Sequence, residues 1–192
     1  MVTALAALLA SLWVAVPAAL VPPFGVPVPA SVGGPFELVD QDGRAVSDRD
    51  FRGRPMLVYF GYTYCPDICP TTLQTLSEAL AEAGAAGKVA FLFITIDPER
   101  DTPERLREYA TLFDPPPLAL TGSPEAVATA ARAYRVFVRR HREPGQDDYA
   151  IDHSAYAYLM DSHGELIRPF RHGVGTAEVA ASIRDALRRS PP

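Results

Sequence analysis

The stretch YFGYTYCPDICP, residues 59–70, contains the only two cysteines of the 192-residue chain. It follows an apolar, β-prone run and precedes a helical pattern, so Cys65 and Cys69 are expected where a strand meets a helix. Cysteines four residues apart on a helical turn lie on one face. Such a pair can close a disulfide or hold a soft metal ion. This spacing and position argue against a pair of inert structural thiols.

The sequence on either side of this stretch alternates strands with helices. Residues 36–50 are expected to form a hairpin that turns at Asp42-Gly43. Residues 139–153 are interpreted as a polar loop. Further strands are predicted over residues 56–62, 88–96, 118–121, 135–138, 154–161 and 165–170, and helices from Pro70, Thr102, Ser123 and Thr176. This order predicts an α/β fold, a thioredoxin-like sandwich with a central mixed sheet, preceded by an apolar N-terminal segment.

The N-terminal segment carries no charged side chain before Glu37, and residues 2–21 are almost wholly apolar. That length is sufficient to span a hydrocarbon core of ~30 Å as a helix. We divide the chain into a membrane anchor or signal segment (1–22), a Pro-rich linker (23–35) and a globular domain (36–192). A cleaved signal peptide lacks its usual basic start here, and a buried helix fits poorly before a Pro-rich linker. We favour the anchor, which would place the domain outside the cytoplasm, in the periplasm.

The bulk composition describes one globular domain. Hydrophobic residues make up 48% of the chain and charged residues 21%, which is enough apolar material for a core. The formal net charge is −5, so no nucleic-acid partner is expected.

The spacing of the two cysteines bears on their chemistry. Thioredoxin-type redox motifs place two residues between the cysteines, whereas three stand between Cys65 and Cys69. The wider spacing still permits a disulfide. A monovalent copper ion prefers thiolate ligands, and two sulfurs with one imidazole would complete a trigonal site. Zinc would normally require a fourth ligand, for which Asp67 offers an oxygen that suits copper poorly.

Four histidines are candidates for the third ligand. His153 is expected at the end of the polar loop and the start of a strand, where it can project toward the cysteines. The alternative for His153 is a hydrogen-bonded side chain at a strand edge. His163 falls in a predicted turn, His172 at the surface, and His141 within a basic run that is typical of a solvated segment.

Three motifs together resemble one protein family. They are YFGYTYCPDICP, then FITIDPERD at residues 93–101, and DHSAYAYLMD at residues 152–161. In this order they resemble the Sco/SenC proteins, which are membrane-anchored, thioredoxin-fold copper proteins that take part in cytochrome c oxidase assembly. The resemblance covers roughly residues 34–189.

The resemblance implies that Cys65, Cys69 and His153 are copper ligands and that the two cysteines can also form a disulfide. It implies a donor role toward the dinuclear copper site of cytochrome c oxidase subunit II, or a thiol-reducing role that prepares that site. Asp97 and Asp101 match an acidic motif of the family. Capping and solvated charge near a helix start explain these two residues as well as a direct role does.

Several functions remain open at this point. The first is a copper-binding assembly factor, or metallochaperone. The second is a thiol–disulfide oxidoreductase, so whether the protein is an enzyme is undecided. A non-catalytic copper or redox sensor is a third, and a peroxidase is disfavoured because the motif supplies no positive donor. His153 separates these functions, since a dithiol enzyme needs no distant imidazole.

Overall fold

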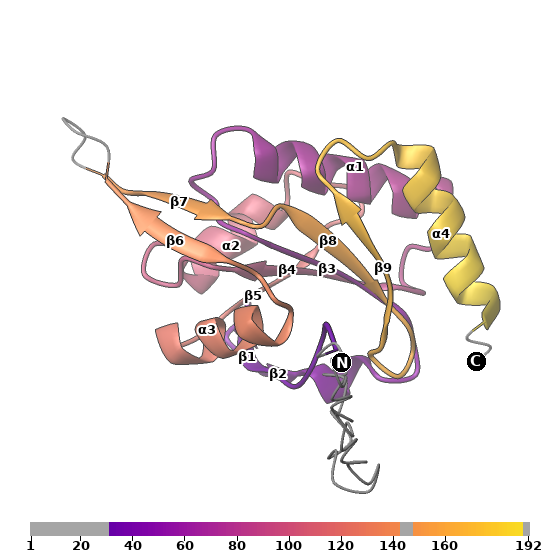
Figure 1. Ribbon diagram of the computed structural model, residues 1–192, viewed down its shortest axis with the longest axis horizontal. Helices are drawn as coiled ribbons and strands as arrows, with labels where there is room; N and C mark the ends of the chain where they lie inside the picture. The colour runs from indigo at the N-terminus through magenta and orange to yellow at the C-terminus, as the bar shows by residue number, and fades with distance from the viewer. Residues whose placement is uncertain (1–30, 143–147, 190–192) are drawn as a thin grey trace, which may run out of the picture. The chain divides into compact units, whose positions relative to one another are not determined.

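The protein is represented by a computed structural model that describes residues 31–142 and 148–189. A seven-stranded mixed sheet forms its centre, in the order β2-β1-β5-β4-β3-β8-β9 (Figure 1). Its strands are β1 (Glu37–Asp40), β2 (Ala45–Ser47), β3 (Met56–Gly61), β4 (Ala90–Thr95), β5 (Leu118–Thr121), β8 (Tyr156–Met160) and β9 (Leu166–Arg171). The parallel pairs are β3–β4 and β4–β5, and the other pairs are antiparallel. The predicted thioredoxin-like sandwich with a mixed sheet is therefore confirmed.

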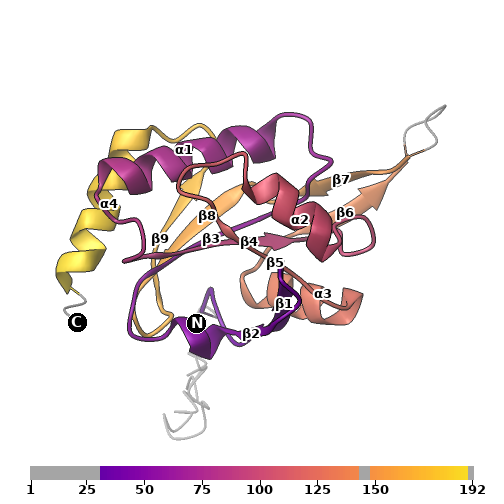
Figure 2. The ribbon, with the colours of Figure 1, turned by 180° about the vertical axis from the view of Figure 1, so that it is seen from behind.

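Within the described ranges, four α-helices cover the sheet. They are α1 (Ile68–Glu82), α2 (Pro103–Ala110), α3 (Pro124–Ala133) and α4 (Thr176–Arg189), and a short 3-10 helix, η2, spans Asp48–Phe51. In both views α1 and α4 lie together on one side of the sheet and α3 lies on the other (Figures 1 and 2). Thr102 and Ser123 cap α2 and α3 as their sequence pattern predicts, each accepting a backbone N–H through its side-chain oxygen.

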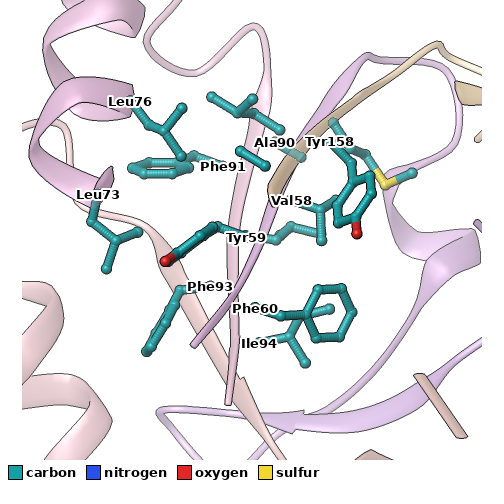
Figure 3. Packing of buried hydrophobic residues seen from close by; sticks show 14 of the residues in the cluster. Val58, Tyr59, Phe60, Leu73, Leu76, Ala90, Phe91, Phe93, Ile94 and Tyr158 are labelled. Carbon is teal, nitrogen blue, oxygen red and sulfur yellow. The ribbon is translucent and has the colours of Figure 1, made fainter. Parts of the chain in front are cut away.

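The core explains why β3 and β4 are continuous apolar runs. Every residue of both strands is buried, because helices cover both faces of the sheet. Successive side chains point to opposite faces, so Tyr59 faces Leu73 of α1 while Phe60 points away from it (Figure 3). The ring of Phe60 instead packs against that of Tyr134, at the end of α3, with the two ring centroids 5.2 Å apart.

The predicted strand at residues 135–138 and the polar loop at 139–153 are wrong. The chain instead forms a separate antiparallel hairpin of β6 (Val138–His141) and β7 (Ala150–His153), which extends away from the main sheet (Figure 1). Arg135, just after the C-cap of α3, has a left-handed conformation with φ of 58°, so no strand can begin there. The hairpin shows no regular alternation of apolar and polar residues because most of β6 is exposed to solvent.

Helix α1 begins at Ile68, two residues before the predicted start at Pro70. Proline is tolerated within the first turn of a helix, where its missing N–H has no partner to lose, so Pro70 lies inside the helix. The consequence is that Cys69 belongs to the first turn of α1, whereas Cys65 precedes it.

The proposed anchor, residues 1–22, lies outside the described residues. Among the helices of the described ranges, none is both long and apolar enough to cross a membrane.

Candidate metal centre

The two cysteines lie at the junction of β3 and α1. Cys65 is half-buried in the loop after β3, whereas Cys69 is fully buried in the first turn of α1, and both are free thiols. The backbone N–H of Cys69 donates to Cys65 Sγ at 3.4 Å. The loop is tightened by the Cys65 N–H, which donates to the Tyr62 carbonyl at 3.2 Å.

His153, the last residue of β7, completes the cluster from the other side. Its Nε2 lies 3.6 Å from Cys69 Sγ, although 84 positions separate the two residues. Its Nδ1 lies 3.1 Å from the Ser154 carbonyl oxygen, which can only accept, so Nδ1 carries the proton. Nε2 is then left with a free lone pair directed at the sulfur. A hydrogen bond from the far ring nitrogen is the usual way in which a protein orients a metal-binding histidine.

The other three histidines lie elsewhere. His163 is exposed in the turn between β8 and β9, as predicted. His172 is also exposed, and its Nδ1 lies 2.9 Å from Thr72 Oγ1. His141 lies on β6 and faces the Asp152 carboxylate at 3.6 Å. Of the four candidate histidines, the structure thus places His153 against Cys69, with Cys65 adjacent.

The positions of Cys65, Cys69 and His153 do not form a complete three-ligand set. Within the described ranges, no group of three or more His, Cys, Asp or Glu side chains is already arranged to hold a metal. The donor chemistry nevertheless suits a soft ion, with two sulfurs and one imidazole. Two ligands bound at roughly 2.0–2.3 Å and about 120° apart stand about 3.7 Å from each other. The 3.6 Å between Cys69 Sγ and His153 Nε2 is close to this distance.

The two thiols differ in acidity. A hydrogen bond from the Cys69 thiol, aided by nearby backbone amides, lowers the pKa of Cys65 to about 4 despite its partial burial. The same hydrogen bond and burial raise the pKa of Cys69. At neutral pH the pair therefore holds one proton between two sulfurs, with Cys65 as the thiolate and Cys69 as the thiol.

Asp97 and Asp101 are not solvated charges near a helix start, because both are fully buried. Asp97 accepts hydrogen bonds from Tyr149 Oη and Arg100 Nε. Asp101 accepts from the Thr63 amide at 3.1 Å and is hydrogen-bonded to the Thr63 and Thr95 hydroxyls, each at 2.6 Å. Burial raises the pKa of Asp101, and these hydrogen bonds oppose that rise.

Sequence reasoning missed the residues that support the sulfur of Cys69. A Cβ atom built on Gly61 would lie 2.8 Å from Cys69 Sγ and 3.0 Å from Phe93 Cε2, so only glycine leaves room for the sulfur. The hydroxyl of Tyr59 is buried and has no hydrogen-bond partner among the described residues. Burial raises the pKa of this phenol, and the neighbouring Cys69 adds to the effect. A glycine at the end of a buried strand was the available signal.

These features define a class of protein: a thioredoxin-like domain with a cysteine pair at a strand–helix junction and a histidine supplied by a separate hairpin. A family model described as SCO1/SenC matches residues 26–188. The chain therefore belongs to the SCO1/SenC family, as the resemblance predicted.

Individual relatives agree with this assignment. The chain is 40% identical to Protein sco1 of Schizosaccharomyces pombe over 156 residues, which cover 79% of this chain and 59% of the relative. It is 38% identical to the human mitochondrial SCO1 homolog over 160 residues, 82% of this chain and 53% of the relative. The match thus spans little more than half the length of these two relatives.

One solved structure is especially similar. The structure of Bradyrhizobium japonicum ScoI with copper bound has a TM-score of 0.76 and 43% identity. The match covers 82% of this chain and 100% of that one.

We predict that Gly61→Ala lowers the free energy of unfolding by about 1–3 kcal/mol, because the new methyl group overpacks the space beside Cys69. Gly61 does not require a left-handed backbone, so the cost is steric. Gly175→Ala is the matched control, since a Cβ atom added to Gly175 would meet no described residue within 4 Å. Denaturant unfolding of both variants measures the difference, and equal losses would contradict the prediction.

We also predict that Cys65 is alkylated before Cys69 in the reduced, metal-free protein. The thiolate persists above its pKa, so the Cys65 rate should fall only as the pH drops toward about 4. An ordinary thiol would lose reactivity below about 8.5. Iodoacetamide labelling at a series of pH values, followed by peptide mass spectrometry, reports each cysteine separately. Two cysteines that both titrate near 8.5 would refute the assignment.

Proposed function

We propose that this protein binds one copper ion through Cys65, Cys69 and His153 and delivers it to the dinuclear copper site of cytochrome c oxidase subunit II. The observation that carries the proposal is the 3.6 Å approach of His153 Nε2 to Cys69 Sγ. A dithiol enzyme has no need of this contact, whereas a trigonal metal site requires it. The oxidase as destination rests on membership of the SCO1/SenC family.

The three residues supply a donor set that fits copper(I). Cys65 is already a thiolate at neutral pH, and His153 presents a bare Nε2 because its Nδ1–H is held by Ser154. Cys69 must lose its proton when the ion binds, so loading releases about one proton near neutral pH. The copper-bound structure of B. japonicum ScoI, 43% identical to this chain, supports a copper ion as the cargo.

The position of the site suits ligand exchange. Cys65 and His153 line an open pocket of about 360 Å³, together with Tyr62, Pro66 and Ile68. Cys69 lies beneath them and is fully buried. A three-ligand copper(I) site leaves room for an acceptor thiolate, which can enter from the pocket on the side of half-exposed Cys65. The ion can then pass between proteins without release to water.

The same proposal places the domain at a membrane. The apolar run at residues 2–21 and the absence of charge before Glu37 support an anchor, with the domain in the periplasm. Such a location also allows Cys65 and Cys69 to be oxidised to a disulfide, which would prevent copper binding.

Copper(I) titration of the reduced full-length chain tests the site. One equivalent should bind tightly, and His153→Ala should weaken binding by at least the ~10–100-fold that loss of a group orienting a metal ligand typically costs. The matched control is His163→Ala, because His163 is exposed and distant from the cluster. X-ray absorption should show two sulfurs and one nitrogen at the metal. Absence of sulfur near the metal would end the proposal.

A second candidate function is reduction of the acceptor's cysteines, which the low pKa of Cys65 favours. The Cys65 thiolate would attack a disulfide in the partner and form a mixed disulfide. Cys69, after losing its proton, would then attack Cys65 Sγ and release the partner's second thiolate. Two electrons would pass to the partner, and Cys65 and Cys69 would be left as a disulfide.

Complementation of a deletion strain separates the two functions. For copper delivery, Cys65→Ser, Cys69→Ser and His153→Ala should all fail to restore cytochrome c oxidase activity, and added copper should partly rescue the deletion. For thiol reduction, only the two cysteine variants should fail. Full activity with His153→Ala would therefore refute copper delivery and leave the reductase.

A further inference from the structure

The ligand-bearing hairpin is not part of the main sheet. Strands β6 and β7 pair only with each other in the described structure, and a two-stranded hairpin is marginally stable alone. Figure 1 shows it extending beyond the seven-stranded sheet. His153 lies at the end of β7, whereas Cys65 lies in the loop after β3 and Cys69 in the first turn of α1. Strand pairing with the main sheet therefore does not by itself fix the imidazole relative to the sulfurs.

The segment that links the two sides is the loop between β4 and α2, residues 97–101, which we call the 97–101 strap. On the hairpin side, Tyr149 Oη donates to Asp97 Oδ1 at 2.6 Å. Arg140 of β6 donates to the same carboxylate at 3.4 Å and to Glu99 at 2.6 Å. The strap thus contacts the hairpin near its loop end, at Arg140 of β6 and at Tyr149, the residue before β7.

The strap also holds the cysteine loop. Asp101 accepts the Thr63 amide and is hydrogen-bonded to the Thr63 hydroxyl, two residues before Cys65. Arg105, in α2, donates to the same hydroxyl at 2.8 Å. The cysteine loop and the hairpin are therefore attached to two carboxylates that are four residues apart in the sequence, Asp101 and Asp97.

Arg100 lies between the two sides. Its guanidinium stands 3.7 Å from the ring centroid of Tyr149 on the hairpin side and 4.6 Å from that of Tyr64, next to Cys65. It donates to Asp97, to the Asp148 carboxylate at 2.7 Å and to the Tyr149 carbonyl at 3.0 Å. One side chain thus contacts the residue before the first cysteine and the segment that leads into β7.

We infer that the 97–101 strap positions His153 against the cysteines, with Asp97, Arg100 and Tyr149 as its positioning residues. The carboxylates of Asp97 and Asp101 are fully buried, so their hydrogen bonds are shielded from water and hold a defined geometry. In its copper part this inference rests on the proposed function, because it assigns the strap a role in forming the ligand set. None of these residues is proposed to touch the ion.

Tyr149→Phe is the variant that tests it. The substitution removes only the hydroxyl that donates to Asp97 and leaves the ring against Arg100. Arg139→Gln is the matched control, because it removes an exposed ion pair to Asp152 within the same hairpin without touching the strap. Both variants are made in the full-length chain, with native His153 and with His153→Ala.

The first measurement needs no copper. In the reduced, metal-free chain, Tyr149→Phe should raise amide hydrogen exchange in β6 and β7 by about tenfold or more, the effect of one lost hydrogen bond to a buried carboxylate. Exchange in β3 and β4 should be unchanged, and the control should match the wild type. If exchange in the hairpin is unchanged, or rises equally across the main sheet, the inference that the strap fixes the hairpin is wrong. This result does not depend on whether the protein binds copper.

The second measurement is copper(I) affinity, by competition with a chromophoric chelator. Tyr149→Phe should weaken binding by about tenfold when His153 is present, as loss of an outer-shell partner does. It should have no further effect with His153→Ala, because the strap acts through the imidazole. Equal weakening in both backgrounds, or none in either, overturns the inference. If His153→Ala alone leaves affinity unchanged, the proposed ligand set fails, and the exchange result still decides whether the strap fixes the hairpin.

Discussion

The burial of one sulfur atom at the end of a strand constrains the rest of the site. Cys69 Sγ occupies the space that a side chain on Gly61 would fill, beneath α1 and beside the ring of Phe93. Because Cys69 is fully buried, its thiol is costly to ionise without a partner, and Cys65 takes the negative charge instead. The 3.6 Å contact with His153 then brings in a segment 84 positions away. In the proposed copper site, acidity, ligand geometry and the path for an incoming thiolate all follow from where this sulfur lies.

Much of the fold could be predicted because local signals agreed with tertiary packing. The apolar runs of β3 and β4 indicated strands covered on both faces, and Thr102 and Ser123 marked two helix starts by their capping chemistry. The cysteine spacing identified the candidate site without any structure. His153 could be singled out because the cysteines lacked a third soft ligand and because the surrounding motif resembled the family.

What could not be predicted depends on contacts between distant segments. The β6–β7 hairpin was interpreted as a loop because most of β6 faces solvent and the two strands lack apolar alternation, so its existence depends on cross-strand pairing such as Val138 with His153. The burial of Asp97 and Asp101 was equally hidden. Their sequence resembles a capping region at a helix start. Only the hydrogen bonds from Tyr149 to Asp97 and from Thr63 to Asp101 explain why both carboxylates can be buried. Polar residues of this kind give no periodic signal.

The division of the site between rigid and separate elements has a physical consequence for the proposed function. Cys69 is fixed by the core, since its sulfur is enclosed by fully buried residues of β3 and β4. His153 belongs to a hairpin outside the main sheet, so it can move without unfolding that core. A carrier must hold its ion tightly enough to exclude water and still release it to an acceptor. A site built wholly within the core would bind but resist exchange, whereas one built wholly on the hairpin would lack a defined geometry. Placing the sulfurs at the β3–α1 junction and the imidazole on the hairpin satisfies both requirements, because exchange can begin at the separate ligand while a core sulfur still holds the ion.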